Sequence, residues 1–185
     1  MPLFRKLQYS TINRTAEKRE VPEGLWMKCK GCGVVVYRSK VDENDHVCPE
    51  CDWHYPLTAG QRIALLTDPD TFQEIDRDLK STDPLEFAGD GVYPEKLEKS
   101  IQKTGMKEAV VCGTAALDGR SIAMGVMDFR FLGASMGSVV GEKFMAGVAR
   151  GLGPRSPLIG INDSGGARMQ EGLLSVMQMD ETCRS

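Results

Sequence analysis

The sequence lacks any uninterrupted apolar run close to the roughly 20 residues that a membrane-spanning helix requires. Its first 20 residues, MPLFRKLQYSTINRTAEKRE, also lack the apolar core and the cleavage site of a secretory signal. Together these absences predict a protein without a membrane span that acts in the cytoplasm.

Histidine is also scarce, because the 185 residues contain only two. Both, His46 and His54, fall in the first third of the chain, so Ser164 has no histidine in its own part of the sequence to activate it as a nucleophile. Cys112, inside an apolar run, and Cys183, near the last residue, stand alone, and neither is expected to be catalytic.

What remains is the composition of a globular protein. With 41% hydrophobic residues, the chain can bury a core and form one medium domain, or a small module and a larger one. The charge is uneven: residues 1–40 hold nine Lys or Arg against three Glu, whereas residues 41–185 hold 14 against 23 Asp or Glu. We expect residues 1–24 to form a basic arm, which is either simply solvated or meets an acidic partner or nucleic acid.

Four of the six cysteines form two C-x-x-C pairs separated by fifteen residues, Cys29 with Cys32 and Cys48 with Cys51. This spacing is typical of two knuckles that close on one tetrahedral metal ion. Four thiolates leave no open coordination position, so the ion is expected to be structural. Zinc is the default, and iron fits the same geometry. His46 or His54 could replace a cysteine as ligand, although four cysteines already complete the site.

The metal module is expected to cover residues 25–57 as a small β ribbon, with a strand in VVVYRS and a turn in DENDH. Its role is open between a rigid docking cap and nucleic-acid recognition. Aromatic and basic residues alternate along it, which suits stacking on bases, although aromatics in so small a module also pack beside the metal. These residues are Trp26, Tyr37, Trp53 and Tyr55 with Lys28, Lys30, Arg38 and Lys40.

The second domain is expected to cover residues 58–185. Thr58 is predicted to cap a helix whose apolar face holds Ile63, Leu65 and Leu66. Residues 76–95 are rich in Asp, Gly and Pro and predict an irregular surface segment. A charged amphipathic helix, EKLEKSIQKTG, follows and should end at its glycine.

Two apolar runs joined by Asp118-Gly119 then predict a β hairpin, and the Ala and Gly within them indicate a closely packed face. Next come a Gly/Ser-rich turn, a helix that should stop at Gly153-Pro154, and SPLIGI, a strand expected to be buried on both faces. Strand, glycine-rich turn and helix thus recur twice, which predicts a layered α/β or β/α spiral body.

The second glycine-rich turn, INDSGGARMQEGL, allows two interpretations. If Gly165 and Gly166 join a strand to a helix that begins near Ala167, their N–H groups lie at its positive end and suit a developing oxyanion. A sterically required turn explains the same pair equally well. Arg168 could pair with Glu171 or meet a phosphate. The methionines between residues 169 and 179 are expected to lie in the core.

Six segments stand in the order found in one known family: PEGLWMKCKGCG, VCPECDWHYPLTAGQRI, DPLEF, KTGMKEAVVCG, FLGASMGSVVGEKF and SGGARMQEGLLSVMQM. From about residue 20 to 179 the chain closely resembles the β subunit of the bacterial and plastid type of acetyl-coenzyme A carboxylase carboxyltransferase. The resemblance implies an N-terminal four-cysteine zinc ribbon followed by part of a crotonase-like (ClpP-like) β/α spiral domain.

The resemblance also implies an activity in fatty acid biosynthesis: transfer of a carboxyl group from carboxybiotin, carried on the biotin carboxyl carrier protein, to acetyl-CoA, which gives malonyl-CoA. An α subunit would complete the site in an α2β2 heterotetramer. In that family the SGGAR glycines, here Gly165 and Gly166, form an oxyanion hole for an acyl thioester. The earlier turn would line the CoA site together with Arg168, through Gly133, Ala134, Ser135, Met136 and Gly137.

Two departures from the family pattern matter. NDSGGAR differs from the SASGGAR of this subunit and is similar to chains that act on propionyl-CoA, so the acyl group stays open. The last six residues leave the pattern and the family continues further, so we expect a truncated chain that is inactive alone. The competing hypotheses are a zinc-ribbon protein that binds nucleic acid and a carboxylase-like subunit for another acyl-CoA.

Overall fold

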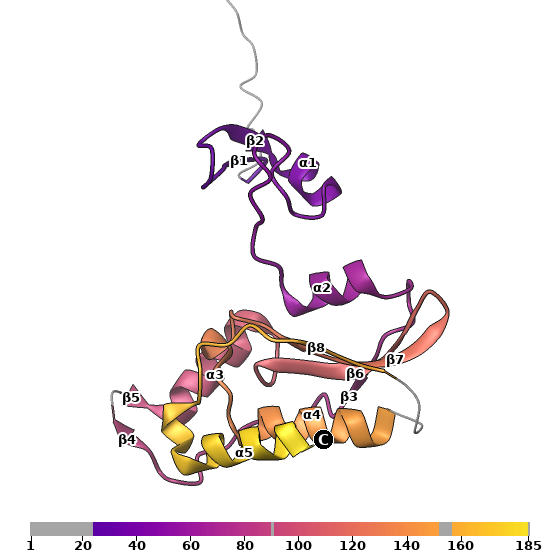
Figure 1. Cartoon of the computed structure of the whole chain (residues 1–185). Helices are drawn as coiled ribbons and strands as arrows, with labels where there is room; N and C mark the ends of the chain where they lie inside the picture. Colours follow the sequence, from indigo (N-terminus) through magenta and orange to yellow (C-terminus); the bar gives the residue numbers. More distant parts are fainter. Residues whose placement is uncertain (1–23, 90, 152–156, 185) are drawn as a thin grey trace, which may run out of the picture. The chain divides into compact units, whose positions relative to one another are not determined.

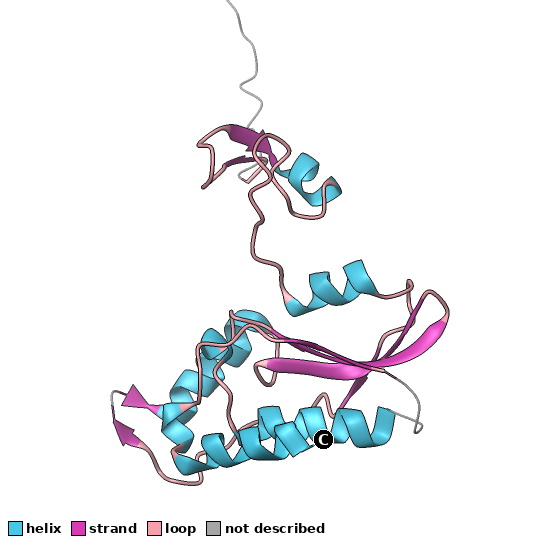
Figure 2. Ribbon diagram, viewed as in Figure 1, coloured by secondary structure: helices cyan, strands magenta, loops and turns pink. Residues whose placement is uncertain are grey.

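The structure is a computed structural model that describes residues 24–89, 91–151 and 157–184. It divides into two compact units, Met1–Tyr55 and Pro56–Ser185 (Figures 1 and 2). The basic arm predicted for residues 1–24 and the stop at Gly153-Pro154 lie outside the described residues, apart from Gly24. Within the described ranges, no helix is long and apolar enough to cross a membrane.

The first unit is built around the two cysteine pairs. Strand β1 (Trp26–Lys28) pairs antiparallel with β2 (Val35–Tyr37), and helix α1 (Arg38–Glu43) follows at once. The predicted strand VVVYRS is therefore shorter than expected, and the predicted turn DENDH begins inside a helix. The helix forms because it turns Val41, only 1% exposed, into the cluster that holds Cys29, Val36 and Cys48.

The second unit contains a four-stranded sheet with the order β3-β6-β7-β8. Strands β6 (Val110–Leu117) and β7 (Arg120–Met127) form the predicted hairpin. Its turn has positive φ at Asp118 (49°) and Gly119 (73°), and the Asp68 carboxylate accepts both turn N–H groups at 3.0 and 2.8 Å. On the sheet, β3 (Gln73–Ile75) is antiparallel to β6, whereas β8 (Leu158–Ile161) is parallel to β7.

Helices cover both faces of this sheet (Figure 2). Helix α2 (Ala59–Leu66) packs on one face, over a cluster that includes Ala115, Ile122 and Val126. Helices α3 (Tyr93–Thr104) and α4 (Ser138–Gly151) contribute to the second cluster, on the other side. Helix α5 (Leu173–Arg184) lies against α4. A short β4–β5 pair (Ala88–Gly89 and Gly91–Val92) stands in the segment predicted to be irregular.

The close packing predicted from small residues in the hairpin is confirmed at Gly125 of β7. An added Cβ there would lie 2.5 Å from the ring of Phe144 on α4. Gly60 on α2 is the opposite case, since a Cβ would meet no atom within 4 Å.

We therefore expect Gly125→Ala to destabilise the second unit by about 1–3 kcal/mol through overpacking. Gly60→Ala should instead be neutral or stabilise it by up to about 1 kcal/mol, because alanine favours the helix. Urea unfolding followed by far-ultraviolet circular dichroism measures both changes. Equal effects of the two substitutions would contradict this packing.

The start of α2 and the end of α3 lie where the sequence predicts them. Thr58 caps α2 with a complete capping box to Gln61, and Asp128 anchors the first turn by accepting the Ala59 N–H at 2.9 Å. Gly105 ends α3 in the left-handed conformation, at a φ of 73°.

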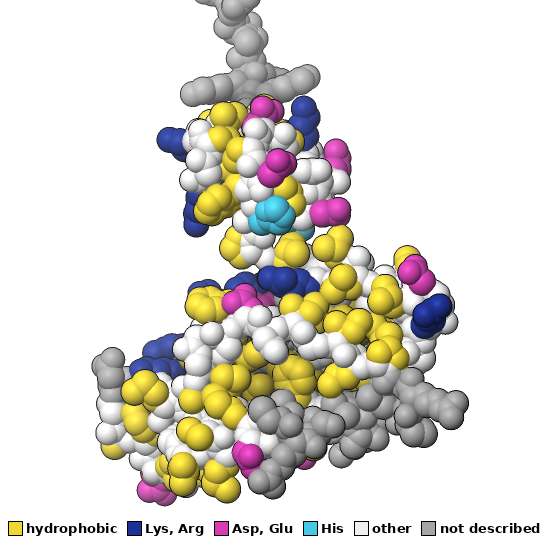
Figure 3. All heavy atoms as spheres, in the orientation of Figure 1, with side chains coloured by type: hydrophobic (Ala, Val, Ile, Leu, Met, Phe, Trp, Pro, Cys, Tyr) yellow, Lys and Arg dark blue, Asp and Glu magenta, His cyan; other side chains and the backbone are white. Residues whose placement is uncertain are grey.

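Three expectations about buried faces are wrong. Of the three apolar residues predicted to share a face of α2, Ile63 is buried, whereas Leu65 and Leu66 are exposed. Hydrophobic side chains gather on the surface around this helix (Figure 3). Within the described sheet β8 is an edge strand, and Leu158 is exposed. Met169, which precedes α5, and Met177, on α5, were predicted to be core but are 81% and 55% exposed. Helix α5 is buried through Ser175 and Gln178 instead.

Candidate functional site

The four cysteines meet at one point, as predicted. One sulfur from each of Cys29, Cys32, Cys48 and Cys51 lies within 4.8 Å of every other. The Cys29 and Cys51 sulfurs are 3.7 Å apart, close to the about 3.8 Å that a tetrahedral ion with 2.3 Å bonds requires. The Gly31 N–H donates to the Cys29 sulfur at 3.3 Å, which is the contact expected of a knuckle turn. The residues fit one structural zinc ion.

Neither histidine belongs to this cluster. His46 lies 3.2 Å from Asp42, and His54 Nδ1 lies 2.8 Å from the Asp52 carbonyl. Of the aromatic residues, Tyr55 packs against the cysteine cluster, whereas Trp26 and Trp53 are 58% and 43% exposed. The ribbon therefore offers aromatic surface that the metal site does not use.

In the second unit the two glycine-rich turns lie side by side. We call residues 132–137 and 164–168 the paired turns. Three backbone bonds join them: Gly165 N–H to the Gly133 carbonyl, Met136 N–H to the Gly166 carbonyl and Arg168 N–H to the Met136 carbonyl, each 2.9 Å. The Ser164 hydroxyl adds a bond to the Ala134 carbonyl at 2.7 Å. Segments about thirty residues apart in sequence thus form one site.

The first of the paired turns has a strained backbone. Three consecutive residues, Leu132, Gly133 and Ala134, have φ of 47°, 64° and 49°. For leucine and alanine the left-handed region costs about 1–2 kcal/mol each. Such strain persists only where surrounding contacts hold it, and it concentrates at functional sites. Here the Gly133 carbonyl accepts the Gly165 N–H, and the Ala134 carbonyl accepts the Ser164 hydroxyl.

The expected position of Gly165 and Gly166 at a helix N-terminus is wrong. A 3-10 turn, η2 (Met169–Glu171), follows them, and helix α5 begins only at Leu173. The chain cannot enter a helix at Ala167 because Ala167 bridges to Met136 and the Arg168 side chain turns into the interior. The helix dipole therefore does not reach these two glycines.

The two glycine N–H groups also differ from each other. That of Gly165 is engaged with the Gly133 carbonyl, whereas that of Gly166 donates to the exposed Ser164 hydroxyl oxygen at 3.1 Å. Gly166 has a φ of 116°, and a Cβ there would meet no atom within 4 Å. The space where a side chain of residue 166 would stand is therefore open, while the Gly166 N–H itself is bonded to Ser164 Oγ.

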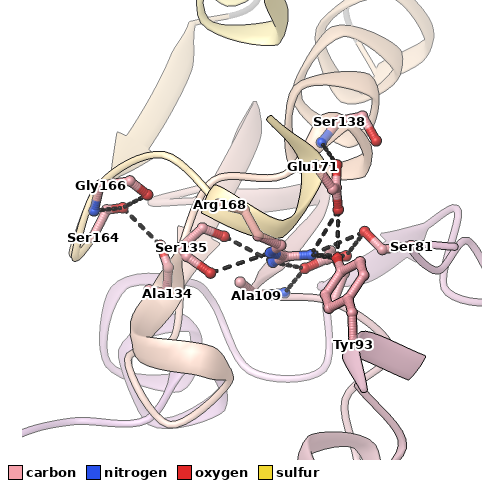
Figure 4. A network of polar contacts seen from close by, with 11 residues as sticks. Ser81, Tyr93, Ala109, Ala134, Ser135, Ser138, Ser164, Gly166, Arg168 and Glu171 are labelled. Atoms are coloured by element: carbon pink, nitrogen blue, oxygen red, sulfur yellow. Dashed lines mark hydrogen bonds and ion pairs between the residues drawn. The ribbon is translucent and has the colours of Figure 1, made fainter. Parts of the chain in front are cut away.

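Arg168 does not meet a phosphate, because it is fully buried and each guanidinium nitrogen already has a partner (Figure 4). Nη1 donates to Glu108 Oε2 at 3.0 Å and Glu171 Oε1 at 3.3 Å, and Nη2 donates to Glu108 Oε1. The same side chain also holds Ser135. Nη2 donates to the Ser135 carbonyl at 2.7 Å, and Nε donates to the Ser135 hydroxyl at 3.1 Å. The predicted pairing with Glu171 is confirmed, and the predicted contact with CoA is replaced by a buried structural role.

Glu171 ties this cluster to the start of α4. Its Oε2 accepts the Ser138 N–H at 2.6 Å, and its Oε1 accepts the Tyr93 hydroxyl at 2.6 Å. Gly137 leaves room for these contacts, since a Cβ there would lie 2.6 Å from Glu171 Oε1 and 2.8 Å from Arg168 Nη1. The cluster therefore needs glycine at this position of the paired turns.

Acid should weaken the second unit through Glu171. Burial raises the pKa of this carboxyl, but the Ser138 N–H, the Tyr93 hydroxyl and Arg168 outweigh burial and lower the pKa below its usual value. The stabilisation is therefore present above the ordinary glutamate pKa of about 4.3 and is lost as the pH falls through the lower folded value. We expect the urea midpoint of the second unit to fall between pH 6 and pH 3, and Glu171→Gln to reduce that fall. An unchanged pH dependence in this variant would contradict the assignment.

No sequence pattern directly indicated that Glu108, Ser81 or Tyr93 is part of the site. Burial of Glu108 could have been suspected, because this acid directly precedes the apolar run AVVC. Ser81 and Tyr93 come from the segment predicted to be irregular, where nothing in the sequence indicates which side chains turn inward.

A cavity of about 570 Å³ adjoins the paired turns. Leu132 and Gly133 form part of its wall, and Ser100, Lys103 and Asp163 contribute polar groups. Its size is within the range of small-molecule sites. It gives a ligand room beside the strained turn.

These features define a class of protein: a four-cysteine zinc ribbon followed by a layered α/β unit with two glycine-rich turns joined by backbone bonds. A solved structure of transcarboxylase 12S, with methylmalonyl-coenzyme A and methylmalonic acid bound, has the same fold at a TM-score of 0.55. It is 24% identical, over 78% of this chain and 24% of that chain. The described chain therefore belongs to the same fold class as that structure.

Within this class the chain belongs to the carboxyl transferase domain family, whose model matches residues 56–183. The acetyl-CoA carboxylase zinc finger domain matches residues 26–51. Two curated relatives carry the name acetyl-coenzyme A carboxylase carboxyl transferase subunit beta. The one from Carboxydothermus hydrogenoformans is 42% identical over 97% of this chain and 63% of its own length. The one from Prochlorococcus marinus is 46% identical over 91% of this chain and 57% of its own length. The chain thus spans about three fifths of these relatives.

Proposed function

We propose that this chain forms part of the β subunit of an acetyl-CoA carboxylase carboxyltransferase, which moves a carboxyl group from carboxybiotin to acetyl-CoA and yields malonyl-CoA. The observation that carries the proposal is the pairing of residues 132–137 with 164–168 by three backbone bonds and one hydroxyl bond. The names of the curated relatives support the same reaction.

The chemistry requires a group that holds negative charge on the thioester oxygen when the acetyl methyl group loses a proton. The Gly166 N–H suits this task, because the absence of a Cβ lets a carbonyl approach the backbone to hydrogen-bonding distance. Ser164 Oγ marks the place that the thioester oxygen would take, 3.1 Å from this nitrogen. Ser164 would then turn away and give up its bond to the Ala134 carbonyl, and the three backbone bonds would still join the paired turns. Gly165 acts beside it by fixing the turn through Gly133, and it can donate only if that bond opens.

The first of the paired turns would line the CoA site with its backbone. Gly133, Ser135 and Met136 are partly exposed, whereas Ala134 and Gly137 are buried and shape the turn from within. The cavity beside Gly133 gives space for the acyl-CoA. Carboxybiotin on the biotin carboxyl carrier protein would supply the carboxyl group and, once that group leaves, the base. No histidine in the second unit is needed. An α subunit completes the proposed α2β2 assembly.

The direct test is Gly166→Val in this chain reconstituted with an α subunit and the biotinylated carrier protein. We expect the rate of malonyl-CoA formation to fall about 10²- to 10³-fold, the usual effect of losing one oxyanion donor. Gly105→Val is the matched control, because Gly105 also has a positive φ (73°) with no atom within 4 Å of an added Cβ. It should leave the rate unchanged.

Equal rates for Gly166→Val and the wild type would show that Gly166 is only a turn residue. Parallel assays with acetyl-, propionyl- and methylmalonyl-CoA decide the acyl group. A preference for either of the larger thioesters would contradict the proposed substrate, and a wild-type assembly without carboxyl transfer would contradict the function.

A second candidate, nucleic-acid binding by the ribbon, is favoured by the exposed Trp26 and Trp53 beside exposed Lys28, Lys30 and Arg38. Gel shift with single-stranded RNA at 50 and 200 mM salt tests it. Binding that weakens steeply with salt would support phosphate contacts, and no shift at low salt would remove this candidate.

A further inference from the structure

We propose that Glu108 is a positioning residue for the paired turns, which acts through Arg168 and never touches the substrate. Its side chain is buried and accepts a bond from Arg168, whose neighbours Ser81, Ser135 and Glu171 are shown in Figure 4. The inference deepens the function proposed above, and its catalytic meaning rests on that function.

Glu108 is itself held rigidly. It is 1% exposed and lies two residues before β6, which is paired on both sides in the described sheet. Its Oε1 accepts the Ala109 N–H at 2.8 Å, and its Oε2 accepts the Ser81 hydroxyl at 2.5 Å. Both carboxylate oxygens of Glu108 are therefore held by contacts that do not involve Arg168.

Arg168 transmits this fixed orientation. Its two terminal nitrogens both donate to the Glu108 carboxylate, a fork that sets the plane of the guanidinium. The other edge of the same group holds Ser135, at 2.7 Å to the carbonyl and 3.1 Å to the hydroxyl. Turning the guanidinium would break both contacts, so the orientation of Glu108 decides the position of Ser135.

Ser135 directly follows the three residues with positive φ, Leu132 to Ala134. A turn in this conformation relaxes unless its neighbours prevent it. Relaxation would move the Gly133 and Ala134 carbonyls, to which Gly165 and Ser164 are bonded. The position of the Gly166 N–H thus depends on the carboxylate of Glu108, which belongs to a different segment of the chain.

Glu171 differs from Glu108 in this respect. It reaches Arg168 through one oxygen only, at 3.3 Å, and its closer contacts go to Ser138 and Tyr93. Glu171 holds the start of α4. In the described cluster, Glu108 is the carboxylate that accepts bonds from both terminal nitrogens of Arg168.

The test is residue-resolved amide hydrogen exchange by NMR on the whole chain with zinc bound. The variants are Glu108→Gln and the milder Ser81→Ala, which removes only the hydroxyl that bridges Glu108 and Arg168. Asp68→Asn is the matched control, because Asp68 also accepts two bonds but serves the remote hairpin turn. The reporters are the amides of Met136, Gly165 and Arg168, compared with the β6–β7 ladder.

We expect Glu108→Gln to speed exchange at the three reporters at least about tenfold while the β6–β7 ladder changes little, since local opening and global unfolding are distinct processes. Ser81→Ala should produce a smaller change with the same pattern, and Asp68→Asn should leave the reporters unchanged. Uniform acceleration across the unit, or no change at the reporters in both site variants, would overturn the proposal.

In the reconstituted assembly, Glu108→Gln should lower kcat at least about tenfold and leave the KM for acetyl-CoA nearly unchanged, because the residue acts on geometry and not on binding. An altered KM with an unchanged kcat would contradict positioning. If the wild-type assembly transfers no carboxyl group, the proposed function fails, while the exchange measurement still decides the role of Glu108.

Discussion

Replacing Arg168 by methionine should destabilise the second unit by about 3–5 kcal/mol, the cost of breaking a buried ion pair by removing one partner. The substitution keeps much of the side-chain volume but leaves Glu108 and Glu171 buried without their cation. Because a domain is stable by only about 5–15 kcal/mol, the unit should lose a large part of its stability. Urea unfolding followed by far-ultraviolet circular dichroism, with zinc bound, measures the change.

Arg130→Met is the control for this prediction. Arg130 also makes a two-pronged contact to a buried carboxylate, that of Asp128, but its own side chain is 48% exposed. Asp128 would still accept the N–H groups of Ala59 and Arg130. The control should therefore cost much less than Arg168→Met. Losses of equal size would mean that the cluster around Arg168 contributes no more than an exposed pair.

Removal of the metal ligand Cys48 should unfold the first unit and leave the second folded. Metal binding in small four-cysteine modules is worth on the order of 10 kcal/mol, and this unit has little other core. Both tryptophans, Trp26 and Trp53, lie in the first unit, so tryptophan fluorescence reports on it alone. We expect Cys48→Ala, or a chelator, to shift the emission to that of solvated tryptophan while most of the helical signal remains.

The matched control is Cys112→Ala, which removes a buried thiol that belongs to the core of the second unit. Cys112 lies outside the cluster of four cysteines, and burial raises the pKa of its thiol to about 12, so the thiol stays protonated at neutral pH. The control should retain one zinc ion per chain by atomic absorption and an unchanged emission spectrum. One zinc ion per chain in Cys48→Ala would contradict the four-cysteine assignment.

Features set by neighbouring residues could be predicted from the sequence. The spacing of the cysteine pairs is such a feature, because a knuckle is a local turn. The same holds for the hairpin at Asp118-Gly119, the cap at Thr58 and the stop at Gly105, each of which depends on the conformation of one or two residues.

Features that depend on distant partners were missed. Of the two alternatives for Arg168, the local pairing with Glu171 could be predicted. Its other partners, Ser81, Tyr93 and Glu108, come from three other segments, and only the tertiary fold brings them together. The helix expected at Ala167 fails for the same reason, since the bridge to Met136 and the buried arginine override the local preference. Apolar character alone also misplaced β8, Met169 and Met177, because it does not say which face a neighbour covers.

The central claim is that the Gly166 N–H holds the thioester oxygen of an acyl-CoA. The most direct measurement is an NMR titration of acetyl-CoA into the assembly with the α subunit, in which this chain carries ¹⁵N-glycine. We expect a saturable shift of the Gly166 amide resonance that coenzyme A without the acetyl group does not produce. Saturable binding of acetyl-CoA that leaves the Gly166 resonance where it was would show that this N–H does not hold the thioester oxygen.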